Sequence, residues 1–84
     1  MASEITYEEL ATLIKTRAGV AVTVDALADP GCMFLDLGVD SLGVLGVLSD
    51  VENRYGVSID SSDLLGRPVA EFLQTVNSSV KAGA

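Results

Sequence analysis

The neighbouring residues Asp40 and Ser41 have the clearest chemical potential in this chain of 84 residues. Both are types that helices favour at the N-cap, and residues 42–55 repeat apolar side chains at helical spacing. We therefore expect Ser41 at a helix N-terminus, where unpaired backbone N–H groups and the helix dipole stabilise negative charge. A hydroxyl there suits attachment of a phosphate ester. The same pair is also an ordinary helix cap, so the pattern alone leaves both interpretations open.

The composition excludes several kinds of site. The chain has no His and a single Cys, which removes a Ser–His pair, an internal disulfide and a cysteine metal cluster. Five basic and twelve acidic residues give a net charge of −7, which repels nucleic acid and favours basic partner surfaces. The first residues lack a secretory pattern, and no apolar run is long enough to cross a bilayer. We expect a soluble, cytoplasmic, non-catalytic protein that binds no metal, nucleic acid or membrane.

The length allows one domain, residues 1–84. After a short tail, a first helix is expected over about residues 6–18. Thr6 and Glu9 have the spacing of a capping box, in which Glu9 reaches back to the backbone of Thr6, and Gly19 ends the helix. Its expected buried stripe consists of Tyr7, Leu10, Ala11, Ile14 and Ala18.

Residues 20–39 form a long connection. It contains the turn signal Asp-Pro-Gly at residues 29–31. Residues 20–24 have the composition of a strand, but a lone strand has nothing to pair with in a helical protein. We expect an extended loop whose apolar side chains hold it against the helices.

The second helix is expected over about residues 41–55. At 100° per residue, one arc holds the side chains expected in the core. Leu42 and Leu45 lie outside that arc, and two exposed leucines beside an acidic residue fit either a docking surface or incidental exposure. Gly43 and Gly46 also fall off the arc, and each costs about 0.5–1 kcal/mol relative to Ala. The arc consists of Val44, Val47, Leu48, Val51 and Tyr55.

Two further helices are expected after Gly56. Polar cap residues at 60–63 favour a short helix over about residues 62–65. Pro68 then starts a helix over about residues 68–77, and the chain from Asn77 onward is expected to fray. The buried stripe of this last helix consists of Val69, Phe72, Leu73 and Val76.

Residues 36–42, Asp-Leu-Gly-Val-Asp-Ser-Leu, resemble the Asp-Ser-Leu signature of acyl carrier proteins, in which the Ser carries 4′-phosphopantetheine. The resemblance continues through residues 52–59, Glu-Asn-Arg-Tyr-Gly-Val-Ser-Ile, to carriers of aromatic polyketide synthases, and it covers nearly the whole chain. It implies an all-α, four-helix acyl-carrier-like bundle with three main helices, one short third helix and a long first loop.

By the same resemblance, the chain is expected to be the discrete carrier of an aromatic (type II) polyketide synthase. A phosphopantetheinyl transferase would move the arm from coenzyme A to Ser41, between Asp40 and Leu42, with Asp40 helping to orient Ser41 and to bind the transferase. The thiol of the arm would then hold growing polyketide intermediates as thioesters. The implied partners are the ketosynthase/chain-length factor, an acyltransferase, a ketoreductase and cyclases, and the carrier is expected to be a monomer.

The resemblance also assigns roles around the arm. Phe34 and Leu37 stand where the family anchors its first loop, whereas Leu35 replaces a usually polar residue and the role of Cys32 stays open. Gly46 stands where the family typically has Glu, so the acidic patch is thinner. The implied docking residues are Asp36, Leu42, Leu45 and Glu52. An acyl-chain cavity would be lined by Leu48, Val51, Ile59, Leu64, Leu65 and Phe72. Apolar helical stripes are more often ordinary core, and both interpretations hold together if the core opens.

Two rival functions fit parts of the pattern. A fatty-acid or peptidyl carrier shares the fold and the Ser. A small helical protein-interaction domain without a prosthetic group would use Asp40 and Ser41 only as a cap. The residues do not specify the starter unit, the chain length or the polyketide.

Overall fold

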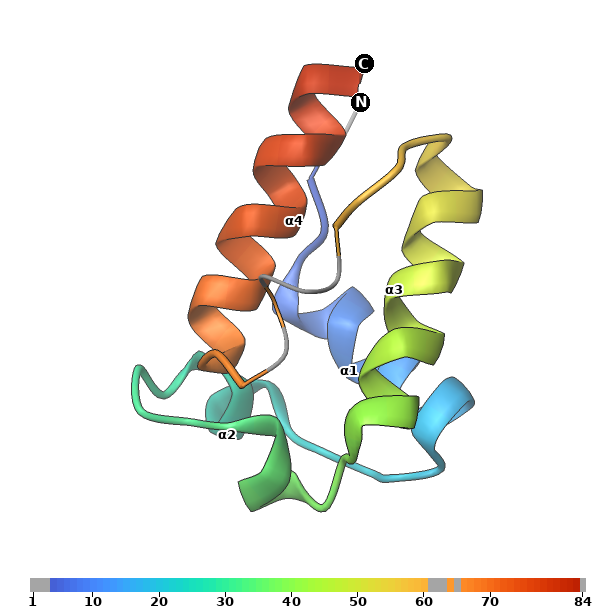
Figure 1. Ribbon diagram of the computed structural model, residues 1–84. Coiled ribbons are helices and arrows are strands. Elements are labelled where there is room, and N and C mark those ends of the chain that lie inside the picture. The colour runs from blue at the N-terminus through green and yellow to red at the C-terminus, as the bar shows by residue number, and fades with distance from the viewer. Residues whose placement is uncertain (1–3, 61–63, 65, 84) are drawn as a thin grey trace.

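The computed structural model describes residues 4–60, 64 and 66–83, and every regular element in this part of the chain is helical. Figure 1 shows α3 and α4 flanking α1, with α2 at the end of the bundle where α3 begins. The expected all-α fold is confirmed. The elements are α1 (Tyr7–Ala18), α2 (Val24–Ala28), the 3₁₀ helix η1 (Phe34–Leu37), α3 (Ser41–Tyr55) and α4 (Val69–Gly83).

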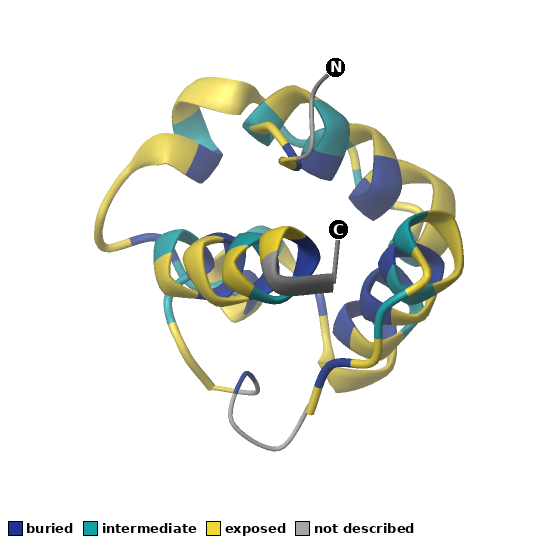
Figure 2. Cartoon of the chain, turned by 90° about the horizontal axis from the view of Figure 1, so that it is seen from above, coloured by how far each residue is buried: buried dark blue, intermediate teal, exposed yellow. Residues whose placement is uncertain are grey.

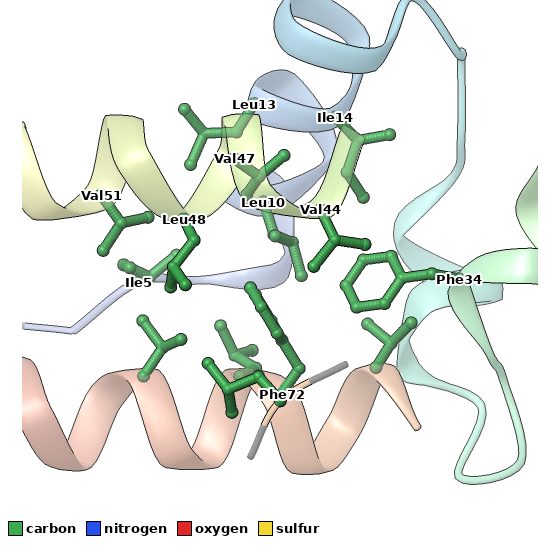
Figure 3. Packing of buried hydrophobic residues seen from close by; sticks show 14 of the residues in the cluster. Ile5, Leu10, Leu13, Ile14, Phe34, Val44, Val47, Leu48, Val51 and Phe72 are labelled. Carbon is green, nitrogen blue, oxygen red and sulfur yellow. The ribbon is translucent and has the colours of Figure 1, made fainter. Parts of the chain in front are cut away.

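The core lies between α1, α3 and α4, and the buried faces of these helices point inward (Figure 2). It is mainly aliphatic, and its aromatic contact is an edge-on pair of Phe34 and Phe72 with ring centroids 5.0 Å apart. Figure 3 shows α1 and α3 contributing facing apolar residues to it. The stripes expected on the second and last helices are confirmed, except that Tyr55 is only partly buried. No helix in the described residues is both long and apolar enough to cross a bilayer.

The first helix begins and ends close to where the sequence predicts. The Thr6 hydroxyl accepts a hydrogen bond from the Glu9 N–H at 3.1 Å, and Gly19 ends the helix at φ +73°. The carboxylate of Glu9 does not reach back to Thr6, however. It accepts a hydrogen bond from the Tyr55 hydroxyl at 3.0 Å, because the end of α3 packs beside the start of α1. Burial and the Glu9 carboxylate together raise the pKa of Tyr55.

The long connection contains two helical segments that the sequence reasoning missed. Val20 and Val22 pack partly buried against the core, as expected of the extended stretch, but Val24 starts α2. The hydroxyl of Thr23 caps that helix by accepting from the Ala26 N–H at 3.2 Å. Burial of Leu27 holds this single turn against the core, which a local strand-like composition could not reveal.

The structure differs from the prediction in the C-terminal part of the chain, where the last helix is longer than expected. The helix expected over residues 68–77 begins at Val69 and continues to Gly83 instead of fraying from Asn77. The short helix expected over residues 62–65 lies outside the described residues, apart from Leu64, which is buried.

The N-terminal segment explains the extra turns of α4. The Asn77 side chain forms two hydrogen bonds with the backbone of Ile5, at 2.6 and 3.1 Å. Val80 is buried, and Lys81 pairs with Glu4 at 2.6 Å. Residues 4 and 5, expected to be part of a free tail, therefore pack against α4 and stabilise its last turns.

Gly43 lies where the last residue of α1 packs tightly against the first turn of α3, which corrects the expectation that it falls off the buried face. It is buried, and a Cβ atom placed on it would lie 2.9 Å from Val39 Cγ1 and 3.0 Å from Ala18 Cβ. Gly46 differs, because its Cβ would lie at an ordinary contact distance of 3.5 Å from Arg17 Cβ. The two glycines therefore have different structural roles.

We expect alanine to have opposite effects at these two positions. Gly43→Ala should lower the free energy of unfolding, because overpacking a buried contact costs about 1–3 kcal/mol and exceeds the gain in helix preference. Gly46→Ala, the matched control, should raise it by about 0.5–1 kcal/mol through helix preference alone. Urea denaturation of both variants measures the difference. Equal effects at the two positions would contradict the close approach at Gly43.

Asp50 is a buried charged residue that the sequence analysis did not single out. It lies on α3, and its carboxylate pairs with Arg17 of α1 at 3.2 Å and with Arg54 one turn further along α3 at 3.3 Å. The hydrogen bond from Arg17 is the main cause that holds the pKa of Asp50 below its ordinary value, against the opposing effect of burial. This cluster joins α1 to α3.

The stability that Asp50 contributes should depend on pH. Because its pKa is lower in the folded chain, the contribution is present above the ordinary value of 3.8 and is lost as pH falls through the depressed pKa. Asp50→Asn should therefore be less stable than the wild type at neutral pH, with a gap that narrows below pH 3.8. Thermal melts across pH measure this gap, with the exposed Asp25→Asn as control. A gap that is independent of pH would refute the assignment.

Candidate functional site

Ser41 is the first residue of α3, and its side chain is exposed. The N-cap is Asp40, whose carboxylate accepts a hydrogen bond from the Gly43 N–H at 2.9 Å. Since Asp40 provides the cap, the Ser41 hydroxyl is not needed for it. The hydroxyl of Ser41 is exposed at the start of the helix, so the geometry permits a group to be attached there, and the attachment itself stays a prediction.

The segment before Ser41 positions this hydroxyl. The 3₁₀ helix η1 ends at Gly38, whose φ of +82° favours glycine, and the Val39 N–H donates to the Phe34 carbonyl at 3.0 Å. Val39 is 1% exposed, so it anchors the chain one residue before the N-cap. A rigid turn therefore holds Asp40 and Ser41 at the end of the bundle.

A pocket of about 170 Å³ opens beside Ser41. Its wall is mostly apolar, and Arg67 is the basic residue among the described residues that line it. The sequence reasoning did not predict this pocket, because its walls come from residues 33–44 and residues 64–67, which lie far apart in the sequence. The described residues that line it are Met33, Phe34, Leu35, Val39, Asp40, Ser41, Val44, Leu64, Gly66 and Arg67.

The residues expected to line an acyl-chain cavity mostly lie elsewhere. Of these residues, only Leu64 lines the pocket beside Ser41, and Leu65 lies outside the described residues. The remaining members are packed in the core, so their role toward an acyl chain stays a prediction. They are Leu48, Val51, Ile59 and Phe72.

The expected docking residues are spread along the molecule. Leu42 is 78% exposed and Leu45 is 37% exposed, both on α3. Asp36 is exposed on η1, and its carboxylate accepts from the Met33 N–H at 3.4 Å. Glu52 lies about 16 Å further along the α3 axis than Ser41, at 1.5 Å per residue. Its carboxylate accepts from the Ile59 N–H at 2.8 Å, so Glu52 also holds the loop that follows α3.

The loop anchors are only partly as expected. Phe34 is buried, whereas Leu37 is partly buried and Leu35, left open by the sequence, is 78% exposed. Leu35 therefore adds an exposed apolar side chain to the surroundings of Ser41. The exposure of Leu35 could have been predicted, because acyl carrier proteins usually have a polar residue at this position.

Cys32 is buried and lies close to the site. Burial is the main cause that raises the pKa of its thiol, and the nearby Asp29 and Asp36 carboxylates raise it further. Its backbone carbonyl accepts from the Val69 N–H at 2.8 Å, which joins the long connection to the start of α4. Cys32 is therefore a structural residue whose thiol stays protonated at neutral pH.

An accessible serine at a helix start, beside an apolar pocket in a small helical bundle, fits the attachment of a long prosthetic arm. Residues 8–76 match the protein family described as phosphopantetheine attachment site. The chain therefore belongs to this family, and its prosthetic group is covalently bound 4′-phosphopantetheine.

The similar proteins are acyl carrier proteins of Streptomyces. The chain is 42% identical to the curamycin polyketide synthase acyl carrier protein of Streptomyces cyaneus, covering 98% of this chain and 94% of that one. It is 40% identical to a probable acyl carrier protein of Streptomyces coelicolor, covering 95% and 90%. It is 30% identical to the anthracycline acyl carrier protein DpsG of Streptomyces peucetius, covering 98% and 99%. No solved structure gave a significant match. The predicted function as an acyl carrier protein is confirmed.

Proposed function

We propose that this acyl carrier protein tethers growing polyketide intermediates through an arm attached to the hydroxyl oxygen of Ser41. The observation that carries the proposal is the exposure of Ser41 at the start of α3, next to a cap that Asp40 supplies alone. The backbone N–H groups of the first turn and the helix dipole favour the negative charge of a phosphodiester there. The similarity to the curamycin synthase carrier supports polyketides as the cargo.

The bound arm supplies a terminal thiol that holds the intermediate as a thioester. The described residues contribute attachment and presentation. Asp40 holds the first turn of α3 in place, and the buried Val39 keeps the segment before Ser41 fixed. A flexible tether raises the effective concentration of the intermediate at each enzyme that binds the carrier. The carrier thus has no catalytic role of its own in this proposal.

The partners that this function requires are a phosphopantetheinyl transferase and the enzymes of a type II synthase. These are a ketosynthase/chain-length factor, an acyltransferase, a ketoreductase and cyclases, all acting in the cytoplasm on a monomeric carrier. The net charge of −7 favours partners with basic surfaces. The proposed contact surface combines exposed leucines with carboxylates around Ser41 and along α3. It consists of Leu35, Asp36, Leu42, Leu45 and Glu52.

Intact-mass spectrometry tests the attachment. The chain is incubated with coenzyme A and a transferase of broad specificity, and fragmentation of the product locates the added group. We expect one phosphopantetheine on Ser41. A chain that stays unmodified while a known carrier in the same reaction is loaded would overturn the proposal. Preferential acylation by polyketide synthase enzymes over fatty-acid or amino-acid-activating enzymes then tests the cargo.

A further inference from the structure

We propose that the pocket beside Ser41 binds the proximal end of the prosthetic arm, and that the guanidinium of Arg67 pairs with the phosphodiester of that arm. This inference rests on the proposed attachment at Ser41. It gives the arm a docked state on the surface of the carrier, in addition to states in which it extends to a partner enzyme.

The size and lining of the pocket decide which part of the arm it can hold. Pockets that enclose a drug-sized ligand measure about 300–1,000 Å³, so about 170 Å³ is too small for a long acyl chain. The first carbon groups of the arm after its phosphate form a compact, branched dimethyl unit. Such a unit matches the apolar walls, which include Val39, Val44 and Leu64. Since Ser41 itself lines the pocket, an arm on its oxygen starts at the rim.

Arg67 is the basic side chain among the described residues that line the pocket. Its backbone is held by the turn at Gly66, which has a φ of +85°, and its N–H donates to the Leu64 carbonyl at 3.3 Å. Its side chain is half-exposed and pairs with Glu71 at 3.3 Å, one helical turn away. Exposed ion pairs of this kind contribute little and a guanidinium carries five N–H donors, so Arg67 can pair with a phosphodiester while it keeps other interactions.

A cation near Ser41 would stabilise a phosphodiester there, because the neighbouring charge is negative. Asp40 lines the same pocket and repels a phosphodiester on the neighbouring residue, although one oxygen of its carboxylate is engaged by the Gly43 N–H. The other basic residues of the chain do not line the pocket; they are Lys15, Arg17, Arg54 and Lys81. Arg17 and Arg54 pair with Asp50, and Lys81 pairs with Glu4 near the chain ends. Arg67 is therefore positioned to offset the repulsion.

A comparison of apo and arm-loaded proteins tests the pair. We expect loading to raise the Tm of the wild type, and Arg67→Gln to reduce that rise by at least half. Lys81→Gln is the matched control, since it also removes one positive charge from an exposed ion pair, and it should leave the rise unchanged.

Nuclear magnetic resonance supplies a second readout. The phosphorus resonance of the loaded wild type and of Lys81→Gln should coincide, and that of Arg67→Gln should differ. Nuclear Overhauser effects should connect the dimethyl protons of the arm to the methyl groups of Val39 or Val44. If Ser41 is loaded but Arg67→Gln matches the wild type in both the Tm rise and the phosphorus resonance, the inference is wrong and the attachment stands. If Ser41 accepts no arm, the proposed function fails first.

Discussion

Replacing Ser41 with alanine is expected to abolish loading of the arm while leaving the fold intact. The variant lacks the oxygen that would form the phosphodiester, so its mass should not change with coenzyme A and a transferase. Its stability should stay within about 0.5 kcal/mol of the wild type, because Ser41 is exposed and Asp40 makes the cap. Mass spectrometry and urea denaturation measure the two effects separately.

Ser49→Ala is the matched control for this experiment. Ser49 is an exposed serine on the same helix, two turns further along, and its replacement should leave loading complete. Asp40→Ala provides the complementary result, because removal of the N-cap should cost about 0.5–2 kcal/mol. Loading of the Ser41→Ala chain, or a Ser41→Ala stability loss as large as that of Asp40→Ala, would show that the role assigned to this hydroxyl is wrong.

Phe72→Ala is expected to cause the largest loss of stability. The ring of Phe72 is 1% exposed and meets Phe34 edge-on at 5.0 Å, so its removal leaves a cavity where α4 meets the loop before Ser41. Truncation of a buried Phe costs about 3–5 kcal/mol. A chain of this length has a total stability of about 4–13 kcal/mol, so the variant should be near the limit of folding.

Two further variants keep this prediction measurable. Phe72→Leu retains most of the volume and should cost less than Phe72→Ala, so it can be studied if the alanine variant does not fold. Leu42→Ala removes an apolar side chain that is 78% exposed and should change the free energy of unfolding by less than about 0.5 kcal/mol. Similar losses in Phe72→Ala and Leu42→Ala would contradict the packing of Phe72.

Local signals predicted the helices that carry the site. Thr6 caps α1, Gly19 and Gly56 end α1 and α3 with positive φ angles, and α3 begins at Ser41 as expected. These features depend on backbone groups within a few residues, which is why the types and spacing of neighbouring residues reveal them. The helical periodicity predicted the buried stripes of α3 and α4 for the same reason, apart from Tyr55, whereas in α1 it missed the buried Leu13.

Contacts between distant segments caused the differences between the predicted and the observed structure. Glu9 pairs with Tyr55 instead of its own helix start, and Gly43 is buried because Ala18 approaches it from α1. The last turns of α4 form because Ile5 packs against Asn77. A periodicity argument treats each helix alone, so it cannot show which neighbour covers a polar or glycine position.

The sequence by itself determined the class of the protein, the start of α3 and the serine that is proposed to carry the arm, because a helix cap and a short signature are local. Only the tertiary structure decided that Asp40 alone forms the cap, that Leu35 is exposed and that a pocket containing Arg67 opens beside Ser41. The pocket needs residues from η1, α3 and the chain before α4 to meet, and the packing of the helices around their common core brings them together.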